Sequence, residues 1–176
     1  MRACSQQSPS GTIGHPPVDL SEYMRLSEFL RSDFVLAQLE ARDVDGVIRE
    51  LSAKAASAGV SPEDLIAHKL LERERAHPTV IGAGLAVPHA TVPGLEEPVI
   101  GVALAPAPVV FGPPGTEPVR LFMVLLSPPG REREHVKILA RICRLIRHAD
   151  FLDQLGSAHD ERAIIRVIEA IDARHA

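Results

Sequence analysis

The sequence predicts a layered α/β domain, with helices covering both faces of a β-sheet. Between residues 77 and 129 the chain is rich in Gly, Pro and short β-branched runs, and helical patterns lie before and after this region. The runs at residues 99–104 and 119–126 are almost entirely apolar, as expected for strands that are covered on both faces. Together these features favour an α/β arrangement.

Two helices are predicted in the N-terminal half. The first begins at about Asp45, carries apolar residues at helical spacing and ends before Gly59, a typical C-terminal stop. The second runs from Ser61 to about Arg75, because Ser61 offers a capping hydroxyl and Pro62 presets a helical φ. Two acidic residues follow Pro62, where the positive end of the helix dipole favours them.

The entry to the domain is less regular. Ser27 is predicted to cap a short helix that leads to Leu30, and residues 34–39 suit a short extended or buried segment. Residues 1–20 have few large apolar side chains, so we expect a disordered tail there and one domain over residues 21–176.

Three strands are predicted in the middle of the chain, at residues 84–87, 99–104 and 119–126. A helix after Gly130 should bury a stripe headed by His135 and keep Arg and Lys on its other faces. That stripe consists of His135, Leu139, Ile142, Cys143 and Ile146. A short helix at about 151–155 and a final amphipathic helix complete the chain.

Composition disfavours several classes of partner. With 19 Lys and Arg against 23 Asp and Glu, the formal charge is -4, and no basic run suits nucleic-acid phosphates. Aromatic residues make up only 3%, so bases have few platforms on which to stack. Cys4 and Cys143 give no disulfide framework, and no apolar run approaches the ~20 residues of a membrane span. We therefore expect a cytoplasmic protein.

The common motifs for metals and nucleotides are missing. None of the eight histidines has the spacing of a metal site. The string VIGAGLAV at residues 80–87 imitates a dinucleotide fingerprint, but Val87 occupies its third glycine position and Pro88 follows at once. No phosphate-cradling loop and no nucleophile elbow occur. No cofactor is expected.

His89 is the candidate nucleophile. It follows the predicted strand 84–87 through Pro88, whose fixed φ could hold the imidazole rigidly at the surface. A neutral imidazole is a competent nucleophile near pH 7, and a hydrogen bond to one ring nitrogen selects the nitrogen that bears the lone pair. Phosphohistidine would be the product of attack on a phosphoryl group.

Three segments resemble a known family. These are E-R-E at residues 72–74, PTVIGAGLAVPHAT at 78–91 and EHVKILA at 134–140. They are similar to the enzyme IIA domain of the mannitol, fructose and nitrogen-regulatory type in the sugar phosphotransferase system, over about residues 26–173. The resemblance implies that family's fold, a small mixed β-sheet flanked by helices. It also implies that His89 is the phosphorylated histidine, with His135 and Arg73 beside it in the active site.

The residues themselves support these roles. Ile66, Leu70 and Arg73 lie at i, i+4 and i+7, which should bring the guanidinium onto the inward face at the end of its helix. His135 lies in the first turn of the next predicted helix, where the dipole favours an anion. Such donors suit the equatorial oxygens of a phosphoryl group in transfer.

Two positions depart from the family pattern. The residue after the phosphorylated histidine is commonly glycine and is Ala90 here. An acidic or amide residue often lies six positions before that histidine, and Ala83 takes its place. Both departures bear on the rate and tuning of His89 more than on the fold.

The resemblance leads to two functional hypotheses, beside a third possibility that the chain is a scaffold that has lost relay activity. In the first, phospho-HPr, or its homologue in a nitrogen-regulatory branch, phosphorylates His89, which passes the group to a IIB component. In the second, phosphorylation of His89 switches the affinity of a regulatory protein for its partners. No IIB, IIC or HPr-like segment occurs in this sequence, which favours the regulatory role. The sugar, if any, is not encoded in these motifs.

Overall fold

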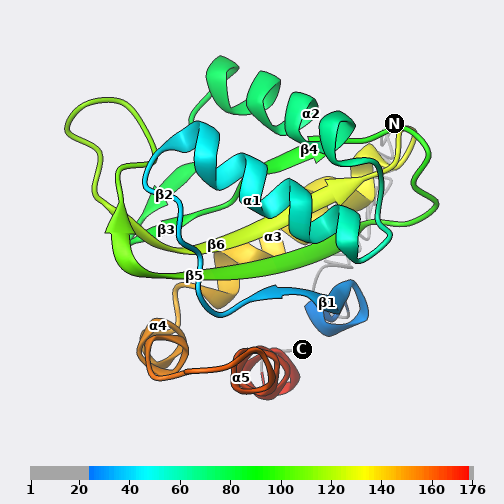
Figure 1. Cartoon of the computed structure of the whole chain (residues 1–176). Helices are drawn as coiled ribbons and strands as arrows, with labels where there is room; N and C mark the ends of the chain where they lie inside the picture. The colour runs from blue at the N-terminus through cyan, green and yellow to red at the C-terminus, as the bar shows by residue number, and fades with distance from the viewer. Residues whose placement is uncertain (1–23, 175–176) are drawn as a thin grey trace, which may run out of the picture.

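A computed structural model describes residues 24–174 and contains one mixed sheet of six strands (Figure 1). The strand order is β1-β5-β6-β3-β2, and β4 also pairs with β6. The strands are β1 (Leu30–Leu36), β2 (Val80–Gly82), β3 (Leu85–Ala86), β4 (His89–Thr91), β5 (Val99–Val109) and β6 (Val119–Ser127). Only β5 with β6 and β2 with β3 pair antiparallel; the other pairs are parallel.

Helices cover both faces of this sheet. One face carries α1 (Val44–Ser57) and α2 (Glu63–Ala76), and the other carries α3 (Glu132–Leu145), α4 (Ala149–Gly156) and α5 (Glu161–Arg174). A single 3₁₀ turn, η2 (Leu26–Glu28), precedes β1. The predicted α/β class and the layered arrangement are confirmed.

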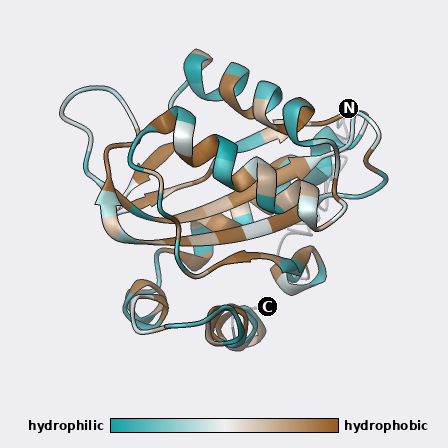
Figure 2. Ribbon diagram, viewed as in Figure 1, coloured by the Kyte–Doolittle hydropathy of each residue, from teal (hydrophilic) through white to brown (hydrophobic). Residues whose placement is uncertain are grey.

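The two hydrophobic cores lie on opposite faces of β6, the central strand. Alternate residues of a strand point to opposite faces, so one strand can serve both cores. Phe122, Val124 and Leu126 join the core under α1 and α2, and Leu121, Met123 and Leu125 join the core over α3, α4 and α5. All six are buried, which accounts for the nearly continuous apolar run (Figure 2).

The first helix follows its sequence signals closely. The Asp43 side chain accepts a hydrogen bond of 2.8 Å from the Gly46 N–H, and Asp45 lies in the first turn. The helix ends at Ser57, and Gly59 adopts a φ of +70° while its N–H bonds the Ala56 carbonyl. This is the predicted glycine stop.

Two predicted caps are wrong. Ser61 does not cap α2, because Pro62 itself occupies the N-cap position and no side chain bonds the first-turn N–H groups there. Ser27 lies inside η2, and its hydroxyl and its N–H both donate to Asp172 of α5. At Ser61 the following proline takes the N-cap position. At Ser27 the contact with Asp172 uses the hydroxyl that was expected to cap the helix.

The predicted strand 84–87 is confirmed as β3, β5 is longer than predicted, and two strands, β2 and β4, were not predicted. β3 and β4 lie end to end along β6, where Leu85 is the partner of Leu121 and His89 is the partner of Leu125. Pro88 interrupts them because it has no N–H for the ladder. His89 therefore begins a second short strand. β2 is a three-residue partner of β3, and β5 extends to Val109.

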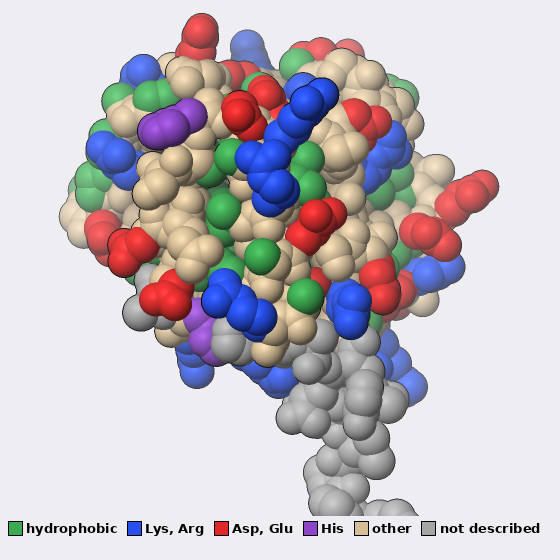
Figure 3. Space-filling model, turned by 90° about the horizontal axis from the view of Figure 1, so that it is seen from below, with side chains coloured by type: hydrophobic (Ala, Val, Ile, Leu, Met, Phe, Trp, Pro, Cys, Tyr) green, Lys and Arg blue, Asp and Glu red, His purple; other side chains and the backbone are tan. Residues whose placement is uncertain are grey.

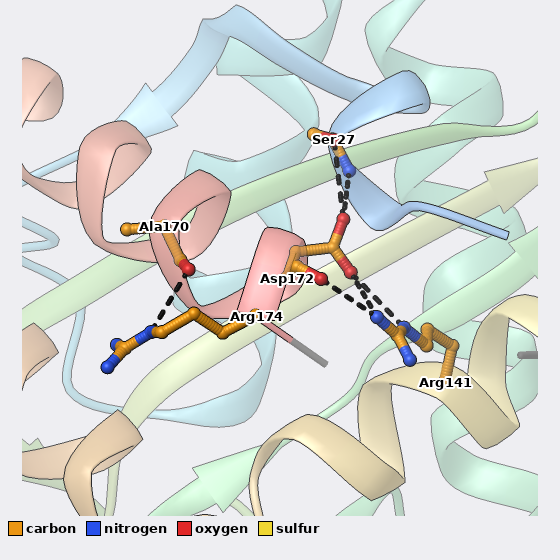
Figure 4. A network of polar contacts seen from close by, with 5 residues as sticks. All are labelled: Ser27, Arg141, Ala170, Asp172 and Arg174. Carbon is orange, nitrogen blue, oxygen red and sulfur yellow. Dashed lines mark hydrogen bonds and ion pairs between the residues drawn. The ribbon is translucent and has the colours of Figure 1, made fainter. Parts of the chain in front are cut away.

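The stripe predicted for α3 is partly wrong. Arg141 is fully buried there, whereas Cys143 and Leu139 are only half-buried. The Arg141 guanidinium donates to the Asp172 carboxylate and to the Asp172 carbonyl, so its charge is paired inside the protein (Figure 4). A buried ion pair between α3 and α5 replaces the apolar contact that periodicity suggested.

The face that carries α4 and α5 is charged and mixed in sign. Acidic and basic side chains are interspersed over it, with hydrophobic side chains visible between them (Figure 3). None of the helices within residues 24–174 is long and apolar enough to cross a membrane. The predicted tail, residues 1–20, lies outside the described residues.

Candidate functional site

Backbone pairing with β6 holds the chain in place at His89. Pro88 is buried, and its carbonyl accepts a hydrogen bond of 3.0 Å from the Leu125 N–H of β6. His89, the first residue of β4, is half-buried, and Ala90 behind it is 5% exposed. The imidazole is thus attached to the sheet itself rather than to a free loop.

A single hydrogen bond decides which ring nitrogen of His89 is reactive. The Nδ1 atom lies 2.8 Å from the carbonyl oxygen of Val87. A carbonyl can only accept, so this contact assigns the proton to Nδ1 in the neutral ring. The lone pair is then on Nε2, which is the nitrogen available as a nucleophile.

His135 is oriented by a serine at the end of the central strand. Its Nδ1 lies 2.8 Å from the hydroxyl of Ser127, which is 1% exposed. The Ser127 carbonyl in turn accepts from the Val92 N–H, just after β4. A hydroxyl both donates and accepts, so this bond fixes the position of the His135 ring without fixing its tautomer.

The two imidazoles lie side by side. Their ring centroids are 5.3 Å apart and their planes are tilted by 55°. Burial lowers the pKa of both rings below the usual 6.5, and the neighbouring positive charge of Arg73 lowers both further. The proximity of the His89 ring also lowers the pKa of His135. Both shifts favour the neutral form of the two rings.

Arg73 completes the group from the last turns of α2. Its Nη1 donates to the His77 carbonyl at 2.7 Å, and its charge acts on both histidines. Ile66 and Leu70 are buried as predicted, but the residue that continues their stripe inward is Glu74, and Arg73 is only half-buried. The guanidinium therefore lies at the rim of the buried face, not within it.

The arrangement is suited to a transient phosphoryl group. A neutral Nε2 can attack, while a guanidinium and a second imidazole lie beside it to bind oxygens that gain charge. His135 also lies in the first turn of α3, whose N-cap residue Arg131 makes no side-chain cap. In residues 24–174, no group of three or more His, Cys, Asp or Glu side chains could hold a metal ion.

Comparison with known proteins identifies the family. Residues 28–171 match the family model described as the phosphoenolpyruvate-dependent sugar phosphotransferase system, EIIA 2. The chain belongs to this family. A nitrogen regulatory protein of Bradyrhizobium diazoefficiens is 34% identical over 146 residues, which cover 82% of this chain and 95% of that protein. A fructose-specific EIIA component of Haloferax volcanii is 27% identical over 128 residues, 72% of this chain and 83% of that protein.

Solved structures of enzyme IIA proteins share the fold. The nitrogen regulatory protein IIA-Ntr of Neisseria meningitidis aligns with a TM-score of 0.74 at 20% identity, covering 81% of this chain and 98% of that one. The Escherichia coli complex of enzyme IIA mannitol with phosphorylated enzyme IIB mannitol contains a match with a TM-score of 0.68 at 15% identity. That match covers 80% of this chain and 99% of the other. The predicted family and its mixed-sheet fold are both confirmed.

The three predicted site residues of this IIA domain are brought together, and three partners were missed. Ser127 and the Val87 carbonyl orient the two histidines, and the buried Glu74 lies one residue from Arg73. Ser127 could have been noticed as a polar residue closing an apolar strand. A carbonyl acceptor leaves no signal in the sequence, because every residue carries one.

Proposed function

We propose that this chain carries a phosphoryl group on Nε2 of His89. The group would come from a phosphohistidine on a carrier of the HPr type and would leave to a IIB component, in the cytosol. The observation that carries the proposal is the 2.8 Å contact between His89 Nδ1 and the Val87 carbonyl. It leaves Nε2 as the unprotonated nitrogen in a ring kept neutral by burial.

The transfer is a displacement at phosphorus. The Nε2 lone pair of His89 forms the new N–P bond as the N–P bond to the donor imidazole breaks, and the electron pair returns to the donor nitrogen. The proton stays on Nδ1, where the Val87 carbonyl accepts from it and stabilises the positive charge that the ring acquires. The Arg73 guanidinium would bind equatorial oxygens, and His135 would donate a hydrogen bond.

Phosphorylation by purified enzyme I, HPr and labelled phosphoenolpyruvate tests this assignment. Wild-type protein should gain one acid-labile label, and His89→Ala should gain none. His68→Ala is the matched control, because His68 is an exposed histidine on α2 away from the sheet. Arg73→Ala and His135→Ala should slow labelling by about 10²-fold, the size of effect seen when a charge-stabilising donor is removed. Label retained by His89→Ala would refute the site.

A regulatory role is the second candidate, and it is favoured by the relatives. Both the Bradyrhizobium protein and the Neisseria structure are named nitrogen regulatory proteins. Val136, next to His135, is 62% exposed, so the face beside His89 offers an apolar contact to a partner. A phosphoryl group on His89 would add charge there and change the affinity of such a partner.

The two candidates differ in where the phosphoryl group goes. Labelled protein should lose its label to an added IIB domain if it is a transport component. In the regulatory case, label should stay on the protein, and affinity for a non-transport partner should differ between wild type and His89→Ala under phosphorylating conditions.

A further inference from the structure

A buried carboxylate lies close behind the site and has no part in the transfer described above. Glu74 of α2 is 6% exposed, although its neighbours Arg73 and Arg75 reach the surface. Burying a carboxylate is costly unless hydrogen bonds satisfy it. Its position therefore calls for a reason beyond the packing of α2.

Both carboxylate oxygens of Glu74 bind the same residue. Oε1 accepts from the Thr79 N–H at 2.9 Å, and Oε2 accepts from the Thr79 hydroxyl through a short hydrogen bond. Thr79 is itself 5% exposed. This pair of bonds fixes the backbone at the point where the chain leaves α2 and enters β2.

The anchored residue in turn holds the segment that carries the tautomer-fixing carbonyl. The Thr79 carbonyl accepts from the Val87 N–H at 3.0 Å, one step beyond the pairing of Val80 with Ala86 in the β2–β3 hairpin. The carbonyl of that same Val87 accepts from Nδ1 of His89. A continuous set of contacts thus runs from Glu74 through Thr79 and Val87 to the candidate nucleophile.

Pairing with β6 also anchors this segment on either side of Val87, because Ala86 is the partner of Phe122 and His89 is the partner of Leu125. The Leu125 N–H donates to the Pro88 carbonyl, which fixes the chain against β6 on the far side of Val87. Without the Thr79 contact, the backbone of Val87 could shift and its carbonyl could turn about the Cα–C bond of Val87, since the Val87–Pro88 peptide bond itself is planar. The acceptor for Nδ1 would then move.

We propose that Glu74 is a positioning residue, which acts through Thr79 and Val87 to hold the His89 ring with its proton on Nδ1 and its lone pair on Nε2. This rests on the proposed role of His89 as phosphoryl acceptor. Glu74 acts on the His89 ring through the position of the backbone at residues 79 and 87, not through its charge. Burial also raises the pKa of Glu74, so a neutral side chain of the same shape is tolerated at this place.

Two readouts on the same variants test the proposal. The first is the ¹⁵N NMR spectrum of the unphosphorylated protein, which reports the tautomer of the neutral His89 ring. The second is the rate of His89 phosphorylation by phospho-HPr, resolved into kcat and KM. Glu74→Ala should populate the Nε2–H tautomer and lower kcat by about 10- to 100-fold, the cost of misplacing a reacting group by about 1 Å. KM should stay within about twofold, because the docking surface is untouched.

Glu74→Gln separates position from charge. A carboxamide can accept from the Thr79 N–H and donate to the Thr79 hydroxyl, so this variant should keep the wild-type tautomer and a kcat within about threefold. Glu72→Ala is the matched control on the same helix, since Glu72 is exposed and forms its ion pair with Lys69 at the surface. Thr79→Val removes one of the two bonds and keeps the shape, and it replaces Glu74→Ala if that variant does not fold.

The outcomes are distinct. A folded Glu74→Ala with wild-type tautomer and kcat would overturn the proposal, as would a loss confined to KM. A Glu74→Gln variant as slow as Glu74→Ala, with an unchanged tautomer, would also overturn it. If wild-type protein accepts no phosphoryl group, the proposed function fails, but the NMR readout still decides whether Glu74 holds the His89 ring.

Discussion

At the scale of single residues, the two histidines are held by the same ring nitrogen but by different kinds of acceptor. His89 has a carbonyl at Nδ1, which dictates the tautomer, whereas His135 has a hydroxyl, which permits either. The fixed tautomer suits His89, which as a nucleophile must keep one ring nitrogen unprotonated. The free choice of tautomer suits His135, which can then donate or accept a hydrogen bond as the phosphoryl group arrives. Ser127→Ala would therefore affect the orientation of His135 and leave the His89 tautomer unchanged.

The backbone conformation of Ala83 gives a physical reason for the residue type that the family usually has at this position. It adopts a φ of +52° at the tip of the β2–β3 hairpin, where a side chain with a Cβ is strained. Asn and Asp tolerate this left-handed region better than alanine. The acidic or amide residue common at this place in the family is thus explained by backbone conformation as well as by polarity.

Ala83→Asn should therefore stabilise the protein by about 0.5 to 1 kcal/mol. Unfolding in urea, with the free energy extrapolated to water, measures the effect. The control is Ala53→Asn at an exposed position inside α1, which should lower stability by about 0.5 kcal/mol because asparagine is a poorer helix former. Equal effects of the two substitutions would contradict the explanation from φ.

Sequence reasoning succeeded at residues whose signal is local and failed where a distant partner decides. The spacing of apolar residues placed α1 and its Gly59 stop correctly, because both depend on the nearest turns of the chain. Ser27 was misread as a cap because its acceptor, Asp172, lies 145 positions away. Glu74 and Ser127 were missed although their partners, Thr79 and His135, lie only 5 and 8 positions away, because these contacts form across the turns that leave α2 and enter α3.

At the scale of elements, one buried ion pair joins three segments. Asp172 of α5 accepts from Arg141 of α3 and from Ser27 of η2 (Figure 4). Both charged side chains are fully buried. Burial of two charges is stable only when hydrogen bonds satisfy them, so the pair specifies how α5, α3 and the entry turn dock. The α3 helix that it holds also carries His135 at its other end.

Asp172→Ala should destabilise the protein by about 3 to 5 kcal/mol, because it removes the buried carboxylate that pairs with the Arg141 guanidinium. Asp33→Ala is the control: its ion pair with Arg31 is largely exposed, and its loss should cost less than about 1 kcal/mol. Urea unfolding monitored by circular dichroism compares the two. A loss for Asp172→Ala no larger than that for Asp33→Ala would show that the buried pair contributes little.

At the scale of the whole molecule, the topology brings the site together at one edge of the sheet. The short strand β4 runs parallel to β6, so Thr91 and Ser127 end at the same level, and α3 starts just beyond. Arg73 lies near the end of α2 and reaches the same place from the opposite face of the sheet to α3. The layered class was predictable from apolar runs, but this convergence was not, because the three-residue strand β4 is too short to leave a pattern in the sequence.

The low pKa values of the two site histidines predict how the stability of the whole domain depends on pH. In the unfolded chain both rings titrate near the usual 6.5, and in the folded protein both titrate lower. Between the two pKa values the unfolded state binds more protons, so the free energy of unfolding rises with pH in that range. Stability should therefore be flat above about pH 7.5 and should fall as pH drops towards 5.5, by at most about 1.4 kcal/mol per pH unit for each histidine.

The double variant His89→Gln/His135→Gln isolates this contribution. Its free energy of unfolding should vary less between pH 7.5 and 5.5 than that of the wild type, measured by urea titration at each pH. Glu74 acts in the opposite direction, because its raised pKa makes the folded state bind the extra proton, and its effect therefore remains in the variant. If wild type and double variant lose stability in parallel as pH falls, then burial of the two imidazoles does not keep them neutral. In that case burial would not raise the fraction of His89 rings that carry a free Nε2 lone pair at a given pH.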